Sequence, residues 1–126
     1  MIDILIVEDN AEFREMLKVI LQSGFPFAQI SEAGEGNAAL REVKRRKPDL
    51  IFMDIRMPGK SGIVLTGEIK KRHLDIVVIV LTQHDTPEYR EAAFANGADY
   101  FLSKESVKAE EIQELVKTII AERRNQ

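Results

Sequence analysis

Five short apolar runs recur along the chain, and longer stretches rich in charged residues separate them. The runs lie at residues 2–7, 27–30, 50–53, 76–81 and 100–102. Three of them, IDILIV, LIFM and IVVIVL, consist mostly of Ile, Leu and Val and do not alternate with polar residues. Strands covered by helices on both faces have this composition, so the runs predict the strands of a parallel sheet.

The stretches between the runs have the periodicity of amphipathic helices. The first and last show it best, with apolar residues at 13, 16, 17, 20 and 21 and at 112, 115, 116, 119 and 120, while positions 39, 40 and 43 give a weaker stripe. Gly24 is the expected C-cap of the first helix, and Ser61 is the expected N-cap of the third. Thr86-Pro87 and Asn96-Gly97 are start and stop signals for the fourth.

Five strand–helix units in a chain of 126 residues predict a single α/β domain over residues 1–126. Crossovers between parallel strands are right-handed, which favours a doubly wound five-stranded sheet with five helices. If the strand order is 2-1-3-4-5, the direction of winding reverses between strands 1 and 3. A binding site is then expected beyond the carboxyl ends of those two strands.

Polar residues follow the apolar runs where that site is expected. Glu8 and Asp9 come after the first strand, and Asp54 comes directly after the third. Thr82 follows the fourth strand, and Lys104 lies just past the fifth. Clustered carboxylates repel one another, and Mg²⁺ relieves this because it binds one or two carboxylates and keeps positions for phosphate oxygens. A carboxylate can also attack a phosphoryl group, so these residues predict a magnesium-dependent phosphoryl-transfer site.

Composition and charge narrow the function classes. The formal net charge is -3, so nothing global attracts nucleic acid or an anionic membrane. The chain has no cysteine, which excludes disulfides and thiolate metal sites. It opens with no signal-peptide pattern, and no apolar run is long enough to cross a bilayer, so we expect a soluble cytoplasmic protein. Basic clusters at 44–47 and 70–73 end two predicted helices, and we interpret them as solvated helix ends.

Four segments, LIVEDN, LIFMDIRMPGKSG, VIVLTQHD and GADYFLSK, resemble the signature segments of the response-regulator receiver family in order and spacing. The resemblance covers the whole chain and implies the flavodoxin-like fold of chemotaxis regulators. It implies that Asp54 is the phosphoacceptor. It also implies that Glu8, Asp9 and Asp54 hold Mg²⁺, with the backbone carbonyl of Arg56 completing the coordination.

The resemblance further implies that Thr82 and Lys104 bind the phosphoryl oxygens and that Phe101 moves inward on activation. Some positions depart from the family's commonest pattern. Gln83 stands where a small residue is usual, and Glu105 stands where proline is usual. The acidic pair is Glu-Asp rather than Asp-Asp, and Phe101 lacks the hydroxyl of a tyrosine. None of these changes removes a catalytic group, but Gln83 affects access and phosphoryl lifetime.

Two histidines need an interpretation, because histidine is the phosphoryl donor in phosphorelays. Neither His73 nor His84 lies in a helical-bundle context, so both are interpreted as ordinary surface residues. His84 lies two residues after Thr82, and Arg56 lies two residues after Asp54. We expect Arg56, Gln83 and His84 to tune how fast phosphorylated Asp54 is hydrolysed.

The expected function is a switch rather than turnover of a substrate. The protein accepts a phosphoryl group from a sensor histidine kinase, a phosphotransfer protein or a small donor such as acetyl phosphate. The partner is a downstream protein or a fused output domain, with no direct nucleic-acid or membrane binding; whether phosphorylation causes homodimerisation stays open. The readout face is the fourth helix, fifth strand and fifth helix, with candidate contacts at Tyr89, Phe94, Tyr100 and Lys108.

Three other functions fit parts of the pattern. A phosphatase with an aspartyl nucleophile generally has a second acid two residues after it, where this chain has Arg56. A receiver that switches by protein contact without phosphorylation would not need the full set of catalytic groups. A nucleotide or flavin binder on the same fold would need a Gly-rich phosphate loop after the first strand, and the sequence has none there.

Overall fold

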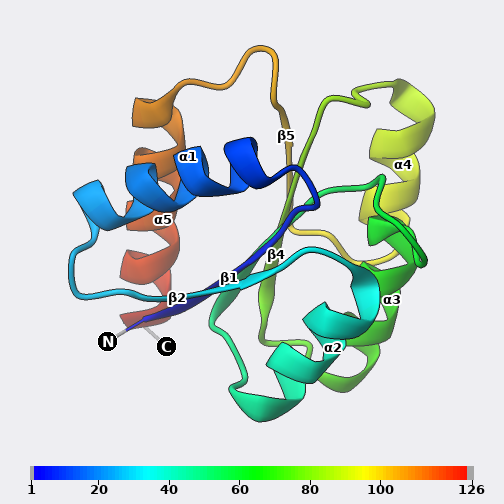
Figure 1. Ribbon diagram of the computed structural model, residues 1–126, viewed down its shortest axis with the longest axis horizontal. Helices are drawn as coiled ribbons and strands as arrows, with labels where there is room; N and C mark the ends of the chain where they lie inside the picture. Colours follow the sequence, from blue (N-terminus) through cyan, green and yellow to red (C-terminus); the bar gives the residue numbers. More distant parts are fainter. Residues whose placement is uncertain (1, 125–126) are drawn as a thin grey trace.

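A computed structural model describes residues 2–124, which form five strands alternating with five helices (Figure 1). The strands are β1 (Asp3–Val7), β2 (Gln29–Ala33), β3 (Leu50–Met53), β4 (Val77–Thr82) and β5 (Tyr100–Ser103). The helices are α1 (Ala11–Gly24), α2 (Gly36–Arg45), α3 (Gly62–Arg72), α4 (Pro87–Ala95) and α5 (Ala109–Arg124). All strand pairs are parallel and the order is β2-β1-β3-β4-β5, which confirms the predicted fold class.

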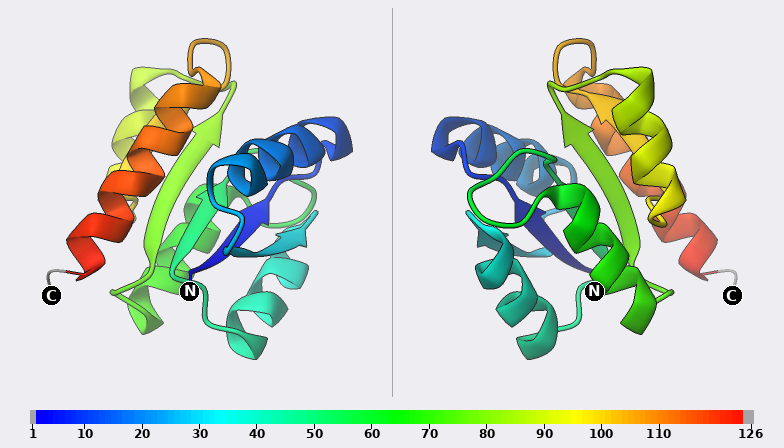
Figure 2. Two further views of the ribbon diagram at one scale, coloured as in Figure 1. Left: turned by 90° about the vertical axis from the view of Figure 1, so that its left-hand side faces the viewer. Right: turned by 90° about the vertical axis from the view of Figure 1, so that its right-hand side faces the viewer.

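Helices cover both faces of the sheet. Helices α1 and α5 lie on one face, and α2, α3 and α4 lie on the other (Figures 1 and 2). Successive strand residues point to opposite faces, so Leu5 and Ile51 pack under α2–α4 while Ile4 and Leu50 pack under α1 and α5. The three central strands, β1, β3 and β4, are thus buried on both sides, which explains their almost continuous apolar composition.

The second strand lies further along the chain than the apolar run at 27–30 predicts. It covers Gln29–Ala33, and Phe27 lies before it with 53% of its surface exposed. Strand β2 is an edge strand that pairs only with β1, so several of its residues face solvent and need not be apolar. Its hydrophobic pattern is therefore too weak to mark its ends.

Helix caps follow the sequence signals with one exception. The Ser61 hydroxyl accepts a hydrogen bond from the Val64 amide (3.3 Å), and Thr86 caps α4 with proline directly after it. Gly24 is not the C-cap of α1 but its last residue, since the cap is Phe25. A Cβ atom at residue 24 would come within 3.0 Å of the Gln113 side chain, so glycine here makes room for α5.

Lys70 corrects the interpretation of the second basic cluster as solvated. Its side chain is only 10% exposed, pairs with Asp99 at 2.8 Å and donates a hydrogen bond to the Ile76 carbonyl at 2.6 Å. The cluster does lie at the end of α3, as predicted, but Lys70 is a structural residue.

No helix within residues 2–124 is long and apolar enough to span a bilayer.

Candidate functional site

The predicted site residues meet at the carboxyl edge of the sheet, beyond β1, β3, β4 and β5. Backbone hydrogen bonds extend past the strand ends and fix their positions. The Asp54 amide donates to the Val7 carbonyl (3.0 Å), and the Lys104 amide donates to the Thr82 carbonyl (2.9 Å). Strand pairing therefore sets the backbone on which the acid and the lysine are placed.

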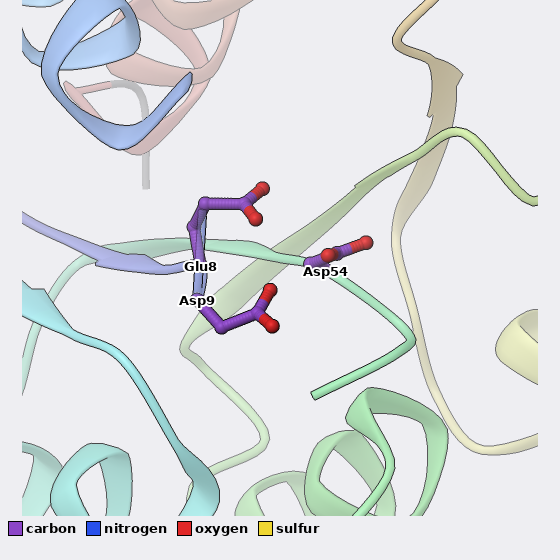
Figure 3. Close-up of side chains that lie close together, drawn as sticks. All are labelled: Glu8, Asp9 and Asp54. Carbon is purple, nitrogen blue, oxygen red and sulfur yellow. The ribbon is translucent and has the colours of Figure 1, made fainter. Parts of the chain in front are cut away.

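Three carboxylates share one space at this edge (Figure 3). Glu8, Asp9 and Asp54 each place an oxygen within 4.8 Å of the others. Glu8 and Asp54 are only 3% and 6% exposed, whereas Asp9 is exposed to solvent. The set is made of hard oxygen donors with one side open to water, which fits Mg²⁺, an ion that keeps several water ligands.

Lys104 is the cation that contacts this cluster. Its Nζ atom lies 2.5 Å from Glu8 Oε1 and 3.6 Å from Asp54 Oδ2. The same atom lies 4.3 Å from the centroid of the Phe13 ring, whose face attracts a cation. Lys104 is therefore held between two buried acids and an aromatic ring, close to where a phosphoryl group on Asp54 would extend.

Burial raises the pKa of the Glu8 carboxyl above its usual value. Hydrogen bonds from Lys104 and the Asn10 amide oppose this effect, and the nearby charge of Asp54 adds to it. One lysine does not balance three acids, so the cluster carries excess negative charge. A divalent cation bound there would relieve that repulsion, which is a second reason why the site fits Mg²⁺.

The loop between β3 and α3 is held tightly against Asp54. The Ile55 amide donates to Asp54 Oδ1 (2.8 Å), and the Gly62 amide donates to the Ile55 carbonyl (2.7 Å). A Cβ atom at residue 62 would lie 1.8 Å from the Asp54 carbonyl oxygen, so only glycine fits there. The backbone that carries the predicted Arg56 carbonyl ligand is therefore fixed at both ends.

Thr82 is fully buried, and its hydroxyl accepts a hydrogen bond from the His84 amide (3.1 Å). Gln83 is exposed. The Arg56 side chain donates a hydrogen bond to the Tyr89 hydroxyl (3.2 Å), and the His84 and Tyr89 rings lie 6.0 Å apart. Three predicted residues, two tuning positions and one partner-face position, thus form a small group beside Thr82.

Phe101 is 7% exposed and packs in the core under α4, so its ring already points inward. The Arg90 guanidinium lies 4.7 Å from its ring centroid. Phe94 is half exposed on α4, Tyr100 packs under the opposite face of the sheet, and Lys108 is exposed just before α5. The predicted partner-face residues therefore come from both sides of the sheet, next to its edge strand β5.

Sequence reasoning missed three side chains that contact the site or its switch residue. Phe13 lies against Lys104, the Arg14 side chain donates to the Glu8 carbonyl (2.8 Å), and Arg90 lies over Phe101. Phe13 belongs to the apolar stripe of α1, so its pattern predicts only a core residue. The position of α1 directly after the acidic pair was the available signal, because its first turn must lie beside the site.

Comparisons with known proteins identify the family to which this fold belongs. The family model of the response regulator receiver domain matches residues 4–117. The chain is 35% identical over 118 residues to the transcriptional regulatory protein DegU of Brevibacillus brevis, covering 94% of this chain and 50% of that protein. It is 38% identical over 104 residues to the phosphate regulon transcriptional regulatory protein PhoB of Escherichia coli, covering 80% and 44%.

A solved structure shows the same fold. The signal receiver domain of a DNA binding response regulator protein from Colwellia psychrerythraea superposes with a TM-score of 0.90 at 28% identity, covering 96% of this chain and 99% of that one. The chain spans about half the length of the curated relatives it matches. From the family match and these relatives, the chain belongs to the response regulator receiver domains.

Proposed function

We propose that this receiver domain accepts a phosphoryl group on Asp54 and that the phosphorylated form changes partner binding. The observation that carries the proposal is the convergence of three carboxylates within 4.8 Å, with Lys104 beside two of them. A purely structural cluster would pair its charges, whereas this one keeps an excess of acid that a cation and a phosphoryl group can use.

In the transfer, an Asp54 carboxylate oxygen forms the new bond to phosphorus while the bond to the donor breaks. That bond is phosphorus–nitrogen in a phosphohistidine of a sensor kinase or phosphotransfer protein, and phosphorus–oxygen in acetyl phosphate. The bonding electron pair stays with the departing imidazole or acetate. Glu8, Asp9, Asp54 and the Arg56 carbonyl would hold Mg²⁺, which supplies charge neutralisation for the phosphoryl oxygens when bound.

Two residues stabilise the product. The Lys104 ammonium would leave Glu8 and contact the phosphoryl oxygens. Its Nζ atom already lies 3.6 Å from Asp54 Oδ2, so only a small movement is needed. The buried Thr82 hydroxyl would donate a hydrogen bond to another oxygen. Because the Lys104 amide is bonded to the Thr82 carbonyl, movement of one strand end would be passed to the other.

The switch that follows would run through α4, β5 and α5. Because Phe101 is already buried, its movement on activation would be a repacking of the ring within the core, which would break its contact with Arg90 and change the exposed surface of α4. The readout residues remain Tyr89, Phe94, Tyr100 and Lys108. Two relatives are named transcriptional regulatory proteins and extend well beyond the matched region, so we propose a cytoplasmic signalling role with a downstream protein or an output domain as target.

Phosphorylation is tested by incubating the protein with acetyl phosphate and Mg²⁺ and measuring its intact mass. We expect one phosphoryl adduct that requires Mg²⁺ and is absent in Asp54→Asn. The control variant Asp85→Asn removes an exposed carboxylate and should keep the adduct. If no adduct forms and beryllofluoride also fails to bind, the protein is instead a receiver that works by contact alone.

The readout face is tested by NMR. Beryllofluoride with Mg²⁺ should shift the backbone amide signals of residues 87–109 as well as those beside Asp54. Shifts confined to the neighbourhood of Asp54 would contradict the proposed switch.

For the tuning residues, Arg56→Ala and His84→Ala should change the rate at which phosphate is lost from Asp54. Unchanged rates in both variants would exclude that role.

A further inference from the structure

A groove between α2 and α3 has features that phosphoryl transfer does not explain. Its volume is about 620 Å³, within the range of about 300–1,000 Å³ that is typical of small-molecule sites. Apolar side chains of both helices contribute to its lining: Leu40, Val43 and Ile69. The two helices that form its walls lie side by side on the face of the sheet away from α1 and α5 (Figure 2).

The rim of this groove is strongly cationic. Five lysine and arginine side chains line it against a single carboxylate, that of Glu68: Lys44, Lys47, Lys60, Lys71 and Arg72. Lys60 pairs with Glu68 (2.9 Å) and Lys47 pairs with Asp75 (2.6 Å). Among the described side chains, Lys44, Lys71 and Arg72 have no ion-pair partner.

Helix-end capping accounts for only part of this charge. Lys44, Lys71 and Arg72 do lie in the last turns of α2 and α3, where cations complement the helix dipole. Lys60 lies in the loop before α3, and Lys47 lies beyond the end of α2. Cations from both helices and from two loops therefore converge on one cavity with apolar side chains in its lining.

We propose that the α2–α3 groove binds a small amphipathic anion, with an apolar body against Leu40, Val43 and Ile69 and an acidic group between Lys44 and Lys71. Charge complementarity favours an anion, and the apolar lining favours a ligand with a hydrocarbon or aromatic part over a simple inorganic ion. The volume suits a small molecule. The site is separate from Asp54, and binding there does not require phosphorylation.

Binding is tested on the unphosphorylated protein with a fluorescent probe, 8-anilino-1-naphthalenesulfonate, at low salt. The matched neutral probe is N-phenyl-1-naphthylamine, which keeps the rings and lacks the sulfonate. We expect saturable one-site binding of the sulfonate, weaker binding of the neutral probe and weakening by added salt. Equal affinity for the two probes would overturn the proposal.

Variants locate the charge that matters. Lys44→Gln/Lys71→Gln should weaken sulfonate binding by about fivefold, because each exposed charge contributes roughly a factor of two to three. Lys117→Glu changes the net charge by the same two units on exposed α5 and should leave affinity unchanged. If the two variants behave alike, the attraction is due to overall charge and the groove is not a site.

NMR locates the bound probe directly, without relying on a change of charge in the protein. The sulfonate probe should shift the amide signals of Leu40, Val43 and Ile69. Shifts centred instead on the exposed apolar residues Met16, Val19 and Phe27 would place the probe on α1 and its following loop, and would overturn the proposal. If a glutamate-rich peptide bound to the groove and the sulfonate did not, the groove would be a surface for acidic proteins rather than a small-molecule site.

Discussion

The two edges of the sheet carry acids in very different arrangements. At the amino-terminal edge, an aspartate begins or shortly precedes four of the strands, and each has its own cation. The pairs are Asp3 with Arg46 (3.9 Å), Asp49 with Arg123 (3.0 Å), Asp75 with Lys47 (2.6 Å) and Asp99 with Lys70 (2.8 Å). At the carboxyl edge, Glu8, Asp9 and Asp54 lie together, and Lys104 is their one ion-pair partner within the described part of the chain.

The acids of the amino-terminal edge stabilise the fold, whereas the acids of the carboxyl edge are available for metal binding and phosphoryl transfer. Two amino-edge acids also accept backbone hydrogen bonds that tie neighbouring strands together: Asp49 from the Asp3 amide and Asp99 from the Val78 amide, both at 2.8 Å. Their charges are neutralised by ion pairs, and their oxygens stabilise the sheet through these hydrogen bonds. The carboxyl edge keeps unbalanced charge, which opposes folding but is available to a metal ion and a phosphoryl group.

Removing the cation of the carboxyl edge should have the largest effect. Lys104→Met is expected to slow phosphorylation of Asp54 by acetyl phosphate by about 100-fold, the usual loss when one charged donor to a transition state is removed. Intact mass against time measures the rate. Lys117→Met removes an exposed lysine on α5 and should change the rate little; an equal loss there would mean that the effect is not local.

Breaking the most buried pair of the amino edge should affect stability instead. Lys70→Met is expected to lower the free energy of unfolding by about 2 kcal/mol, mainly because the buried Ile76 carbonyl loses its hydrogen-bond donor. Urea denaturation measures this. Lys47→Met breaks an exposed pair and should cost less than about 1 kcal/mol. Both variants should keep the wild-type phosphorylation rate. A large loss of rate in either would mean that the amino-terminal edge also contributes to phosphorylation.

Mg²⁺ should stabilise the protein through the carboxyl edge alone. At ten times its dissociation constant, a ligand of the folded state adds about 1.4 kcal/mol to the free energy of unfolding. For a domain of this size the melting temperature should rise by about 5 °C. Asp9→Asn should reduce the shift, whereas Asp75→Asn should not. A shift of equal size in both variants would argue against the carboxylate site.

The smallest expected effect is on the pH dependence of the free energy of unfolding, which should have opposite signs for acids at the two edges. Burial raises the pKa of Glu8 above 4.5, so its contribution to stability is present below that pH and is lost as pH rises through the raised pKa. A hydrogen bond from Lys47 lowers the pKa of Asp75 below 3.8, so its contribution is present above that pH and is lost as pH falls.

Without Mg²⁺, stability relative to wild type should therefore rise with pH for Glu8→Gln and fall with pH for Asp75→Asn. Urea denaturation of both variants and wild type, carried out at pH 3, below the unfolded-state pKa of Asp75, and again at pH 7, measures these differences. Because Asp75 is exposed, its change should be the smaller one. Changes of the same sign in both variants would contradict the assignment of opposite pKa shifts.

The sequence predicts the fold and the acidic site well because both depend on local patterns. Continuous apolar runs mark the buried strands, and the residue after each run must lie at the carboxyl edge. Edge strand β2 was misplaced because its half-exposed residues lack that pattern. The burial of Lys70 was missed because it depends on Asp99, a residue distant in the chain that only the folded structure brings close.

Gly62 has a consequence for how this protein tolerates substitution. The close approach of its backbone to the Asp54 carbonyl leaves no room for any side chain. In a screen of all single substitutions for signalling, position 62 would be depleted as strongly as position 54, although glycine performs no chemistry. A parallel screen for cellular abundance would separate the two, because variants at 54 would accumulate normally and variants at 62 would be degraded.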